Sequence, residues 1–301
     1  MKLYISDAKW GKTTIYRQTS QFSGIAGSHI WSSFPDTDYD FLVSFGTDEL
    51  SDSMRGYPKK KRVFVMHENP LVWKPNKEEL DQFGIIISPW ASIRDSLTDQ
   101  LLIQAHSGVP WFYGIDFRTD KGLLHQPLRT SKELDYLCGS RQLGKTKTAS
   151  FIVSGKGWLE GHKWRIAVAN ALNNKYPGKI DIFGFGHKPL PDKALALDRY
   201  RFSIVIENTP SEYYWTEKLA DCILGSATPI YSGASNAKRE LGIDFPTINF
   251  GGDPEKTAEI IMRITEDYEI DSGAIDSCRQ GILKQHNFMY WIPRLLESQI
   301  S

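Results

Sequence analysis

Short apolar runs alternate with amphipathic segments along most of this 301-residue chain. Such alternation is typical of parallel β-sheets that are covered by helices. In the first half, the pattern predicts strands over residues 2–6, 41–45, 62–66 and 84–88, with a helix over 76–83 between the last two. These elements predict a first α/β domain.

The second half repeats the alternation more regularly and predicts a doubly wound domain. Its expected strands are 150–153, 179–183, 202–206 and 228–231, followed by a further strand over 247–250. Helices are expected over 163–175, 217–224 and 254–267, with a short one over 193–199. The tail, 275–300, has a helical pattern that is interrupted near Asn287.

A polar and basic segment, 123–149, has no sustained apolar period and predicts the connection between the two domains. We therefore expect a first domain over 1–145, a second over 146–285, and a C-terminal helix, 286–301, that packs back on the first. Two doubly wound, Rossmann-like α/β domains facing a cleft form the architecture called GT-B in glycosyltransferases, although a fold alone does not fix a function.

The composition is that of a globular protein, with 41% apolar residues, 24% charged residues and a formal net charge of zero. This balance argues against nucleic acid or an anionic membrane as the main partner, so any bound anion must meet a few local cations. Three widely spaced cysteines lack metal-ligand spacing and predict thiols in a reducing compartment. No apolar run reaches the roughly 20 residues that span a bilayer, and no signal-like start is present, so we expect a soluble cytosolic protein.

Two short motifs resemble well-known sites in an unsuitable context. Residues 139–146, GSRQLGKT, match the phosphate-loop pattern GxxxxGKT, but a strand rather than a helix is expected after them. We interpret them as a basic loop that leads into the second domain, with a nucleotide loop as the alternative. Asp36-Thr37-Asp38 resembles a metal-binding DxD, but it precedes a strand, which favours a turn.

The stretch 202–218, FSIVIENTPSEYYWTEK, predicts a buried strand, a polar turn and the start of an amphipathic helix. Ligands of open α/β sheets lie at the carboxyl ends of the strands, and a helix that starts there offers free N–H groups to a phosphate. The strand ends at Glu207 and Asn208, and Tyr214 and Lys218 lie at the helix start. The alternative is an ordinary helix capped by Thr216, with exposed charges in its first turn.

Other strand ends of the second domain add polar or small residues to the same crevice. Ser154 follows the first strand and Gly184 follows the second, where the missing side chain lets a base or ribose approach the backbone. Arg165 lies near the start of the helix between them, and a guanidinium can bind a pyrophosphate in bidentate fashion. Arg165 and Lys218 together provide two positive charges for a diphosphate, which favours a sugar nucleotide as ligand.

Residues 202–233, FSIVIENTPSEYYWTEKLADCILGSATPIYSG, resemble the signature block of the α1,3/4-fucosyltransferase family. Members carry a strand ending in Glu-Asn-Ser, then Asp-Tyr-x-Thr-Glu-Lys, then a Val-Pro-Val-x-x-Gly strand. FIVSG, Arg165 and IDIFG resemble further family elements in the second domain, and RVFVMHENP resembles a family segment in the first. The chain departs from the pattern at Gly155 and Tyr213, where Asn and Asp are usual. The positions on the pattern are Asn208, Tyr214, Thr216, Glu217, Lys218, Pro229 and Gly233.

The resemblance implies an inverting, GDP-fucose-dependent transferase of the GT-B fold that acts on a glycan acceptor. It makes Glu68, in RVFVMHENP, the counterpart of the general base, which takes the proton of the acceptor hydroxyl. It implies that Glu217 binds the ribose hydroxyls, while Tyr214 and Asn208 contact phosphate or fucose. Lys218 and Arg165 then stabilise the charge on the leaving GDP.

The resemblance further implies that no metal is obligatory, with Mn²⁺ as a stimulating ion only, and an α1,3-type linkage to GlcNAc or Glc. We expect a soluble bacterial or viral type that acts in the cytoplasm, next to the membrane where its acceptor is made. Two alternatives stay open. One is a GT-B transferase for another GDP- or UDP-sugar, and the other is a non-catalytic protein that binds a sugar nucleotide.

Overall fold

The computed structural model describes residues 1–6, 11–33, 38–46, 50–108, 110–116, 118–119, 122–123, 129–130, 132–139, 144–184 and 186–300. Contacts divide the chain into two compact units. Unit 1 comprises Met1–Pro110, Glu133–Asp135 and Lys284–Ser301, and unit 2 comprises Trp111–Lys132 and Tyr136–Leu283. No helix in the described part of the chain is long and apolar enough to cross a membrane.

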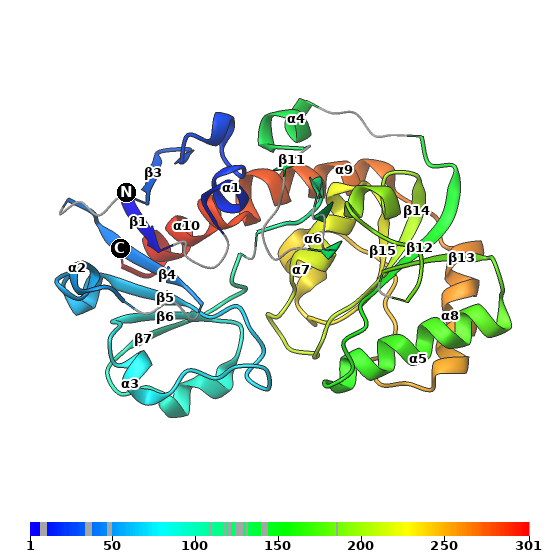
Figure 1. Cartoon of the computed structure of the whole chain (residues 1–301), viewed down its shortest axis with the longest axis horizontal. Helices are drawn as coiled ribbons and strands as arrows, with labels where there is room; N and C mark the ends of the chain where they lie inside the picture. The colour runs from blue at the N-terminus through cyan, green and yellow to red at the C-terminus, as the bar shows by residue number, and fades with distance from the viewer. Residues whose placement is uncertain are drawn as a thin grey trace. The chain divides into compact units, whose positions relative to one another are not determined.

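Unit 1 is built on a sheet of strands in the order β2-β3-β1-β4-β5-β6-β7 (Figure 1). All neighbouring pairs are parallel except β2 and β3. Successive parallel strands along the chain require crossover connections, which is the arrangement of a Rossmann-like unit. The strands are β1 (Lys2–Ser6), β2 (Ile25–Ala26), β3 (His29–Ser32), β4 (Phe41–Phe45), β5 (Arg62–Val65), β6 (Ile85–Ser88) and β7 (Leu101–Gln104).

The helices of unit 1 are short except for the C-terminal one, α10 (Phe288–Ile300). Phe288, Met289, Ile292 and Leu296 of α10 recur at helical spacing and are buried in one core cluster with residues of β1, β4 and β5. The final helix therefore completes the core of a sheet that begins at residue 2. The other elements are α1 (Gly11–Tyr16), α2 (Asp52–Arg55), α3 (Lys77–Leu80) and the 3₁₀ turns Ser20–Phe22, Lys59–Lys61 and Ala91–Ser96.

Unit 2 is built on a parallel sheet in the order β13-β12-β14-β15, of strands β12 (Lys147–Val153), β13 (Ile180–Gly184), β14 (Tyr200–Ile206) and β15 (Thr228–Ser232). Helices α5 (Glu160–Lys175) and α8 (Pro254–Asp267) pack side by side on one face (Figure 1). Helices α6 (Glu217–Leu224) and α9 (Ser272–Gly281) contact each other on the opposite face. This is a doubly wound layer arrangement, as the sequence predicts.

The remaining elements are short. They are α4 (Leu134–Gly139), α7 (Ala237–Leu241), the 3₁₀ turn Lys193–Ala196, the π-helical turn Ile282–His286, and the two-residue strands β8 (Ile115–Asp116), β9 (Arg118–Thr119), β10 (Gly122–Leu123) and β11 (Arg129–Thr130). The predicted interruption near Asn287 is confirmed, because this residue separates the π-helical turn from α10.

The predicted strand over 247–250 is wrong. Thr247 forms only an isolated parallel bridge with Tyr231. Two backbone hydrogen bonds join this segment to β15. The N–H of Tyr231 donates to Pro246 O, and the N–H of Ile248 donates to Tyr231 O. No strand is assigned to Asn249 and Phe250, so the pairing with β15 ends after this single bridge.

The contacts divide the chain near residue 110, earlier than the boundary expected from the polar segment at 145/146. Trp111–Lys132 belongs to unit 2 because its backbone is bound by carboxylates of that unit. The N–H groups of Phe112 and Tyr113 donate to Asp221 Oδ1 at 2.7 and 2.8 Å. Composition alone does not reveal these long-range bonds.

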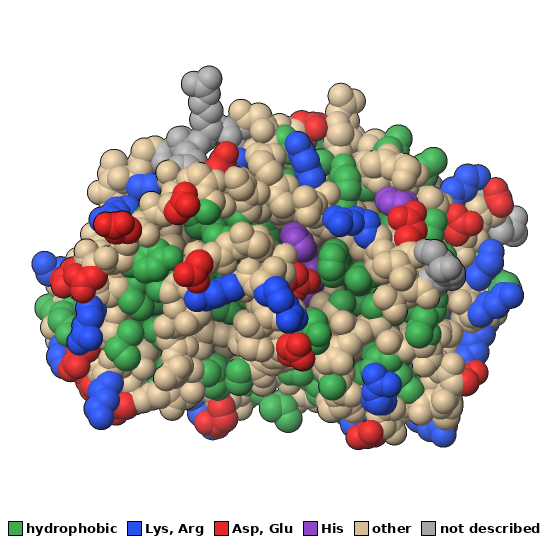
Figure 2. Space-filling model, turned by 180° about the vertical axis from the view of Figure 1, so that it is seen from behind, with side chains coloured by type: hydrophobic (Ala, Val, Ile, Leu, Met, Phe, Trp, Pro, Cys, Tyr) green, Lys and Arg blue, Asp and Glu red, His purple; other side chains and the backbone are tan. Residues whose placement is uncertain are grey.

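Lysine, arginine and acidic side chains are interspersed over the face that Figure 2 shows. This mixture agrees with the formal net charge of zero. Both observations imply that binding of an anion depends on particular side chains rather than on a field of one sign.

Truncating the side chain of Phe288, which packs α10 against its sheet, should destabilise unit 1 strongly. Phe288 is fully buried, with its ring 4.9 Å from Phe45 and 5.5 Å from Trp31. We expect Phe288→Ala to lower the free energy of unfolding by about 3–5 kcal/mol, since a large cavity remains. Urea titration followed by tryptophan fluorescence measures this. Leu71→Ala, at a side chain that is 77% exposed, should change it by less than about 0.5 kcal/mol. Equal effects of the two variants would contradict the packing assigned to α10.

Candidate functional site

The carboxyl ends of four parallel strands meet at one edge of the unit 2 sheet. Ser154 directly follows β12, Gly184 ends β13, and Glu207 with Asn208 directly follows β14. The register pairs Val153 with Gly184, so the first two ends lie side by side. The predicted convergence of these strand ends is present, and the helix α6 begins ten residues after Glu207 at Glu217.

Gly184 is required by the backbone at this edge. Its φ of 112° lies in a region that side chains rarely adopt, and a Cβ atom here would lie 2.0 Å from the carbonyl oxygen of Val153. The glycine therefore lets β13 end against β12 without a clash. The close approach to a ligand that we predicted for Gly184 stays a prediction.

A buried carboxylate fixes the start of α6. Glu207 is fully buried, and its Oε1 accepts hydrogen bonds from the backbone N–H of Thr216 at 2.9 Å and from Thr216 Oγ1 at 3.0 Å. Thr216 is the N-cap residue, and its Oγ1 accepts from the N–H of Lys218. Thr216 thus caps α6, as the alternative interpretation of this stretch expected. The strand end and the helix start are thus joined by one side-chain network.

Lys218 is the accessible cation of this network. Its Nζ lies 3.3 Å from Glu207 Oε2 and 3.4 Å from Glu217 Oε1, and it donates to Thr216 Oγ1 at 3.1 Å. The side chain of Lys218 is 25% exposed, whereas Glu207 is not exposed at all. A ligand that reaches this edge therefore meets the ammonium group and the N-terminus of α6, both of which favour an anion.

Glu217 is held as a carboxylate. Burial raises the pKa of its side chain, but Lys218 and Lys193 outweigh this effect and lower the pKa to about 2. Oε1 of Glu217 lies 3.8 Å from Lys193 Nζ. An ionised carboxylate at this position can accept hydrogen bonds from hydroxyl groups of a ligand.

Lys193 and Asp221 were not among the predicted site residues. Lys193 Nζ donates to Asp221 Oδ2 at 2.5 Å. Burial lowers the pKa of Lys193, but Asp221 and Glu217 outweigh it and raise the pKa, so the lysine stays charged. The chain separates Lys193 from Asp221 by 28 positions and no local motif joins them, so the sequence offered no signal for this ion pair.

Arg165 is more deeply buried than predicted. It lies on α5 with 4% exposure, and its Nη2 donates to Ile206 O at 2.7 Å and to Asn208 Oδ1 at 2.8 Å. Within the described residues its buried Nε has no hydrogen-bond partner. The guanidinium therefore positions the end of β14 and Asn208, and one of its donors is left for another group.

Tyr214 and Asn208 lie on the connection between β14 and α6. Tyr214 is 4% exposed, and the neighbouring Trp215 donates from Nε1 to Glu240 Oε2 at 3.0 Å. Gly161 of α5 packs on this connection so closely that a Cβ there would lie 2.2 Å from Asn208 O. The structure brings both residues to the same edge as Lys218, and their predicted contacts with phosphate or fucose stay predictions.

The lysine of the GxxxxGKT motif, Lys145, is hydrogen-bonded to backbone carbonyl groups. Lys145 Nζ donates to the carbonyl oxygens of Leu197, Asp198 and Gly225 at 3.1, 3.1 and 2.5 Å. A strand rather than a helix follows the motif, as the sequence predicts, although β12 begins at Lys147 and not at the expected residue 150. These contacts favour the basic loop over a nucleotide loop, although 140–143 lie outside the described residues.

The DxD motif is described only in part. Asp36 and Thr37 lie outside the described residues, and Asp38 Oδ2 pairs with Lys2 Nζ at 2.9 Å.

The candidate base, Glu68, lies at the carboxyl edge of the unit 1 sheet, three residues after β5 ends. Its side chain is 31% exposed, and its Oε1 lies 3.8 Å from Nε2 of the buried His67. Trp90 Nε1 donates to the carbonyl oxygen of Glu68 at 3.1 Å. The backbone is thereby fixed while the carboxylate can reach solvent. The role of Glu68 as the base stays a prediction.

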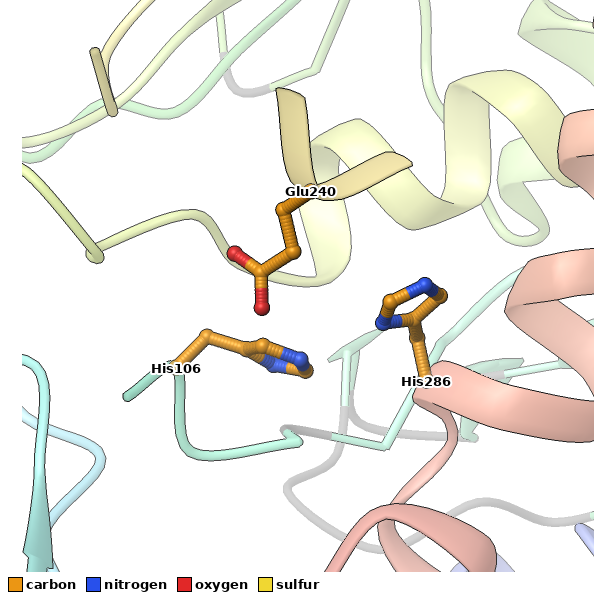
Figure 3. A group of neighbouring side chains, drawn as sticks. All are labelled: His106, Glu240 and His286. Atoms are coloured by element: carbon orange, nitrogen blue, oxygen red, sulfur yellow. The ribbon is translucent and has the colours of Figure 1, made fainter. Parts of the chain in front are cut away.

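Two further histidines of unit 1 pack against Trp291 of α10. The ring of His106 stacks on that of Trp291 with 4.3 Å between the centroids, and the centroids of His106 and His286 lie 5.6 Å apart. Figure 3 shows the two imidazoles as neighbours. Burial lowers the pKa of His106 well below its ordinary value and lowers that of His286 to about 4. Both are therefore neutral near pH 7 and help to attach α10 to its sheet.

The charge of Glu217 should contribute to acid stability. Its pKa in the folded protein, about 2, lies below the ordinary value of 4.5, so its stabilising contribution is complete above pH 4.5 and is lost as the pH falls toward 2. Urea unfolding between pH 4.5 and 2 should therefore be less pH-dependent for Glu217→Gln than for the parent chain. Glu255→Gln, at an exposed first-turn glutamate of α8, is the control and should retain the parent's slope. Parallel curves for Glu217→Gln and the parent would disprove the assignment.

No family model matches the chain. Curated relatives share parts of it. The human 4-galactosyl-N-acetylglucosaminide 3-alpha-L-fucosyltransferase FUT6 is 32% identical over 96 residues, which is 30% of this chain and 27% of the relative. The Pan troglodytes protein of the same name is 26% identical over 197 residues, 64% of this chain and 46% of the relative. The chain thus covers less than half of the length of these curated relatives.

Solved structures resemble the chain over most of its length. The Anabaena protein Alr3699/HepE in complex with UDP and glucose is 10% identical, with a TM-score of 0.51 over 99% of each chain. An alpha1,3-fucosyltransferase in complex with GDP is 20% identical, with a TM-score of 0.47 over 96% of this chain and 92% of that one. The GT-B fold class is confirmed. The resemblance to fucosyltransferases that the sequence predicts is borne out as a similarity to the curated relatives.

Proposed function

We propose that this chain is an inverting glycosyltransferase that moves L-fucose from GDP-fucose to a hydroxyl of a glycan acceptor, in an α1,3-type linkage to GlcNAc or Glc. The observation that carries the proposal is the network at the start of α6, where Glu207 fixes Thr216 and the partly exposed ammonium of Lys218 lies beside the helix N-terminus. The sequence similarity to fucosyltransferases supports the choice of donor.

The donor side of the reaction needs stabilisation of the leaving diphosphate. As the bond between the anomeric carbon and the GDP oxygen breaks, negative charge grows on that oxygen, and Lys218 and the N–H groups of α6 stabilise it. Arg165 adds a positive charge, and its unpartnered Nε is the kind of buried donor that a phosphate oxygen satisfies. Glu217 accepts hydrogen bonds from the ribose hydroxyls. These groups replace an obligatory metal ion in our proposal, with Mn²⁺ as a stimulating ion only.

The acceptor side needs a base. The acceptor oxygen attacks the anomeric carbon from the face opposite GDP, and its proton passes to the Glu68 carboxylate. This single displacement inverts the configuration at the anomeric carbon. Glu68 lies on unit 1 at a sheet edge where its carboxylate is half-exposed, which supports access to an acceptor.

The remaining predicted residues belong to the donor side of the proposal. Tyr214 and Asn208 contact phosphate or fucose, and Ser154 and Gly184 line the nucleotide. The protein works in the cytoplasm, near the membrane that holds its acceptor.

The experiment that tests the proposal is a donor screen. Purified chain is incubated with an N-acetyllactosamine acceptor and, in turn, GDP-fucose, GDP-mannose, UDP-glucose or UDP-GlcNAc, and release of the nucleotide is measured. Release with GDP-fucose alone supports the proposal. Release with another donor favours a GT-B transferase for that sugar, and binding without release favours a sugar-nucleotide binding protein. A second readout is the anomeric configuration of the product. Inversion of a β-linked donor sugar gives an α-linked product.

Removing the Lys218 ammonium should weaken nucleotide binding. Charge-assisted hydrogen bonds contribute about 1.5–3 kcal/mol, so Lys218→Ala should lower the affinity for GDP by roughly tenfold to a hundredfold in calorimetry. Lys163→Ala is the matched control, because Lys163 is an exposed first-turn lysine of α5 that pairs only with Glu160 among the ion pairs of the described residues. GDP affinity that is unchanged in Lys218→Ala would remove the phosphate role.

Removing the Glu68 base should affect turnover rather than donor binding. Glu68→Gln keeps the size of the side chain but cannot take a proton, so transfer should fall by roughly 10² to 10⁴-fold while GDP affinity stays unchanged. Glu78→Gln, on the exposed surface of α3 in the same unit, should transfer fucose at the parent's rate. Equal rates for Glu68→Gln and the parent would exclude Glu68 as the base.

A further inference from the structure

Lys193 lies between two carboxylates of α6. Its Nζ donates to Asp221 Oδ2 at 2.5 Å and lies 3.8 Å from Glu217 Oε1. Glu217 and Asp221 are four positions apart on α6, so they project from the same side of this helix. Lys193 is the first residue of the 3₁₀ turn Lys193–Ala196, which faces that side. One ammonium group therefore compensates two carboxylates.

The backbone and the ammonium group of Lys193 are both held in place. Asp192 caps the 3₁₀ turn, because its Oδ1 accepts from the N–H of Ala194 at 2.8 Å. The same oxygen accepts from the N–H of Gly114 at 3.0 Å. Nζ of Lys193 lies 5.2 Å from the ring centroid of Phe112, within the range of a cation–π contact. The lysine therefore has little freedom to leave the two carboxylates.

Asp221 is the fixed partner of this lysine. Its side chain is 2% exposed, and its Oδ1 accepts from the N–H groups of Phe112 and Tyr113 at 2.7 and 2.8 Å. A buried carboxylate with several hydrogen bonds keeps its position and needs a cation beside it. Asp221 is too deeply buried to bind a ligand, so it anchors Lys193 instead.

Glu217 is the member of the group that a ligand can reach. Its side chain is 17% exposed, and Lys218 Nζ lies 3.4 Å from its Oε1, closer than Lys193 Nζ does. In the proposed function a diphosphate engages Lys218 and draws its ammonium group away from Glu217. The Glu217 carboxylate would then repel the diphosphate unless a second cation compensated its charge. Lys193 is placed to be that cation.

We propose that Lys193 is a positioning residue of the donor site, which holds the Glu217 carboxylate for the ribose hydroxyls while Lys218 binds the diphosphate. The inference rests on the proposed function, because that function assigns the ribose to Glu217. Ribose is common to GDP-sugars and UDP-sugars, so the role of Lys193 does not depend on the base of the donor. Lys193 acts through Glu217 and does not itself bind the ribose.

The test must remove the ammonium group without leaving a buried charge unpaired. Lys193→Met alone would leave Asp221 uncompensated, which strongly destabilises a fold. The test variant is therefore Lys193→Met combined with Asp221→Asn, since an amide oxygen can still accept the two backbone N–H groups. Asp221→Asn alone is the matched reference, because it differs from the test variant only at the lysine. Lys193→Arg keeps the positive charge, and circular dichroism checks that each variant is folded.

Calorimetry then compares GDP with 2′,3′-dideoxy-GDP, which lacks both ribose hydroxyls. The parent chain, Lys193→Arg and Asp221→Asn should bind GDP more tightly by roughly tenfold to a hundredfold, as expected for hydrogen bonds to a charged group. In the test variant this preference should fall to about threefold or less. Adding Glu217→Ala to the test variant should reduce it no further, because both changes remove the same contact.

A preference that is equal in the test variant and in Asp221→Asn would overturn the positioning role. An equal loss of affinity for both nucleotides would also overturn it, because Lys193 would then act on the diphosphate or on the fold alone. UDP and 2′,3′-dideoxy-UDP are measured in parallel to separate the two proposals. A ribose preference with UDP alone would contradict GDP-fucose as the donor, while the four variants still test Lys193. Absence of binding of either nucleotide by the parent chain would contradict both proposals.

Discussion

The buried carboxylate of Glu207 is the interaction on which the candidate site depends. A fully buried charge is tolerated only where hydrogen bonds and an opposite charge surround it. Here the N–H and Oγ1 of Thr216 and the ammonium of Lys218 meet that requirement. The same bonds fix where α6 starts and which way its first turn points, so a stabilising contact and a binding geometry are produced by one residue.

The charges around Glu207 also limit how strongly this edge can bind an anion. Lys218 and Lys193 already face carboxylates, from Glu207, Glu217 and Asp221. A diphosphate must therefore compete with these groups for the ammonium of Lys218, and the affinity is a difference between two sets of ion pairs. Such a site releases its nucleotide more readily than one with uncompensated cations. That property suits a proposed transferase, which must release GDP after each cycle.

Local patterns predicted most of the fold. The bounds of β1, β4, α6 and α8 match the expected ranges. The signals that set them, namely apolar runs, capping residues and Pro254 at a helix start, each involve only a few neighbouring residues. Two features could not be read in this way. The contact division near residue 110 depends on backbone bonds to Asp221, and the end of the segment after Thr247 depends on a single bridge to Tyr231. Both contacts join positions that are far apart in sequence.

The site shows the same division between local and distant information. Glu207, Thr216 and Lys218 are neighbours on one strand, turn and helix, so their proximity follows from that local pattern. The depth of Arg165 and the pairing of Lys193 with Asp221 follow from how α5 and a 3₁₀ turn pack on the sheet, which no motif encodes.

The carboxyl edge of the parallel sheet explains why the residues of the candidate site come from several separate parts of unit 2. Every strand of such a sheet ends on the same side, and each end is followed by a turn whose backbone and side chains are free to vary. The ends of β12, β13 and β14 provide the residues of the proposed donor site, and Gly233 directly follows the end of β15. A Cβ at position 233 would lie 2.5 Å from Glu207 Cγ, so the chain after β15 helps to fix the position of this carboxylate. Close packing therefore lets a residue that carries no side chain contribute to the geometry of the candidate site.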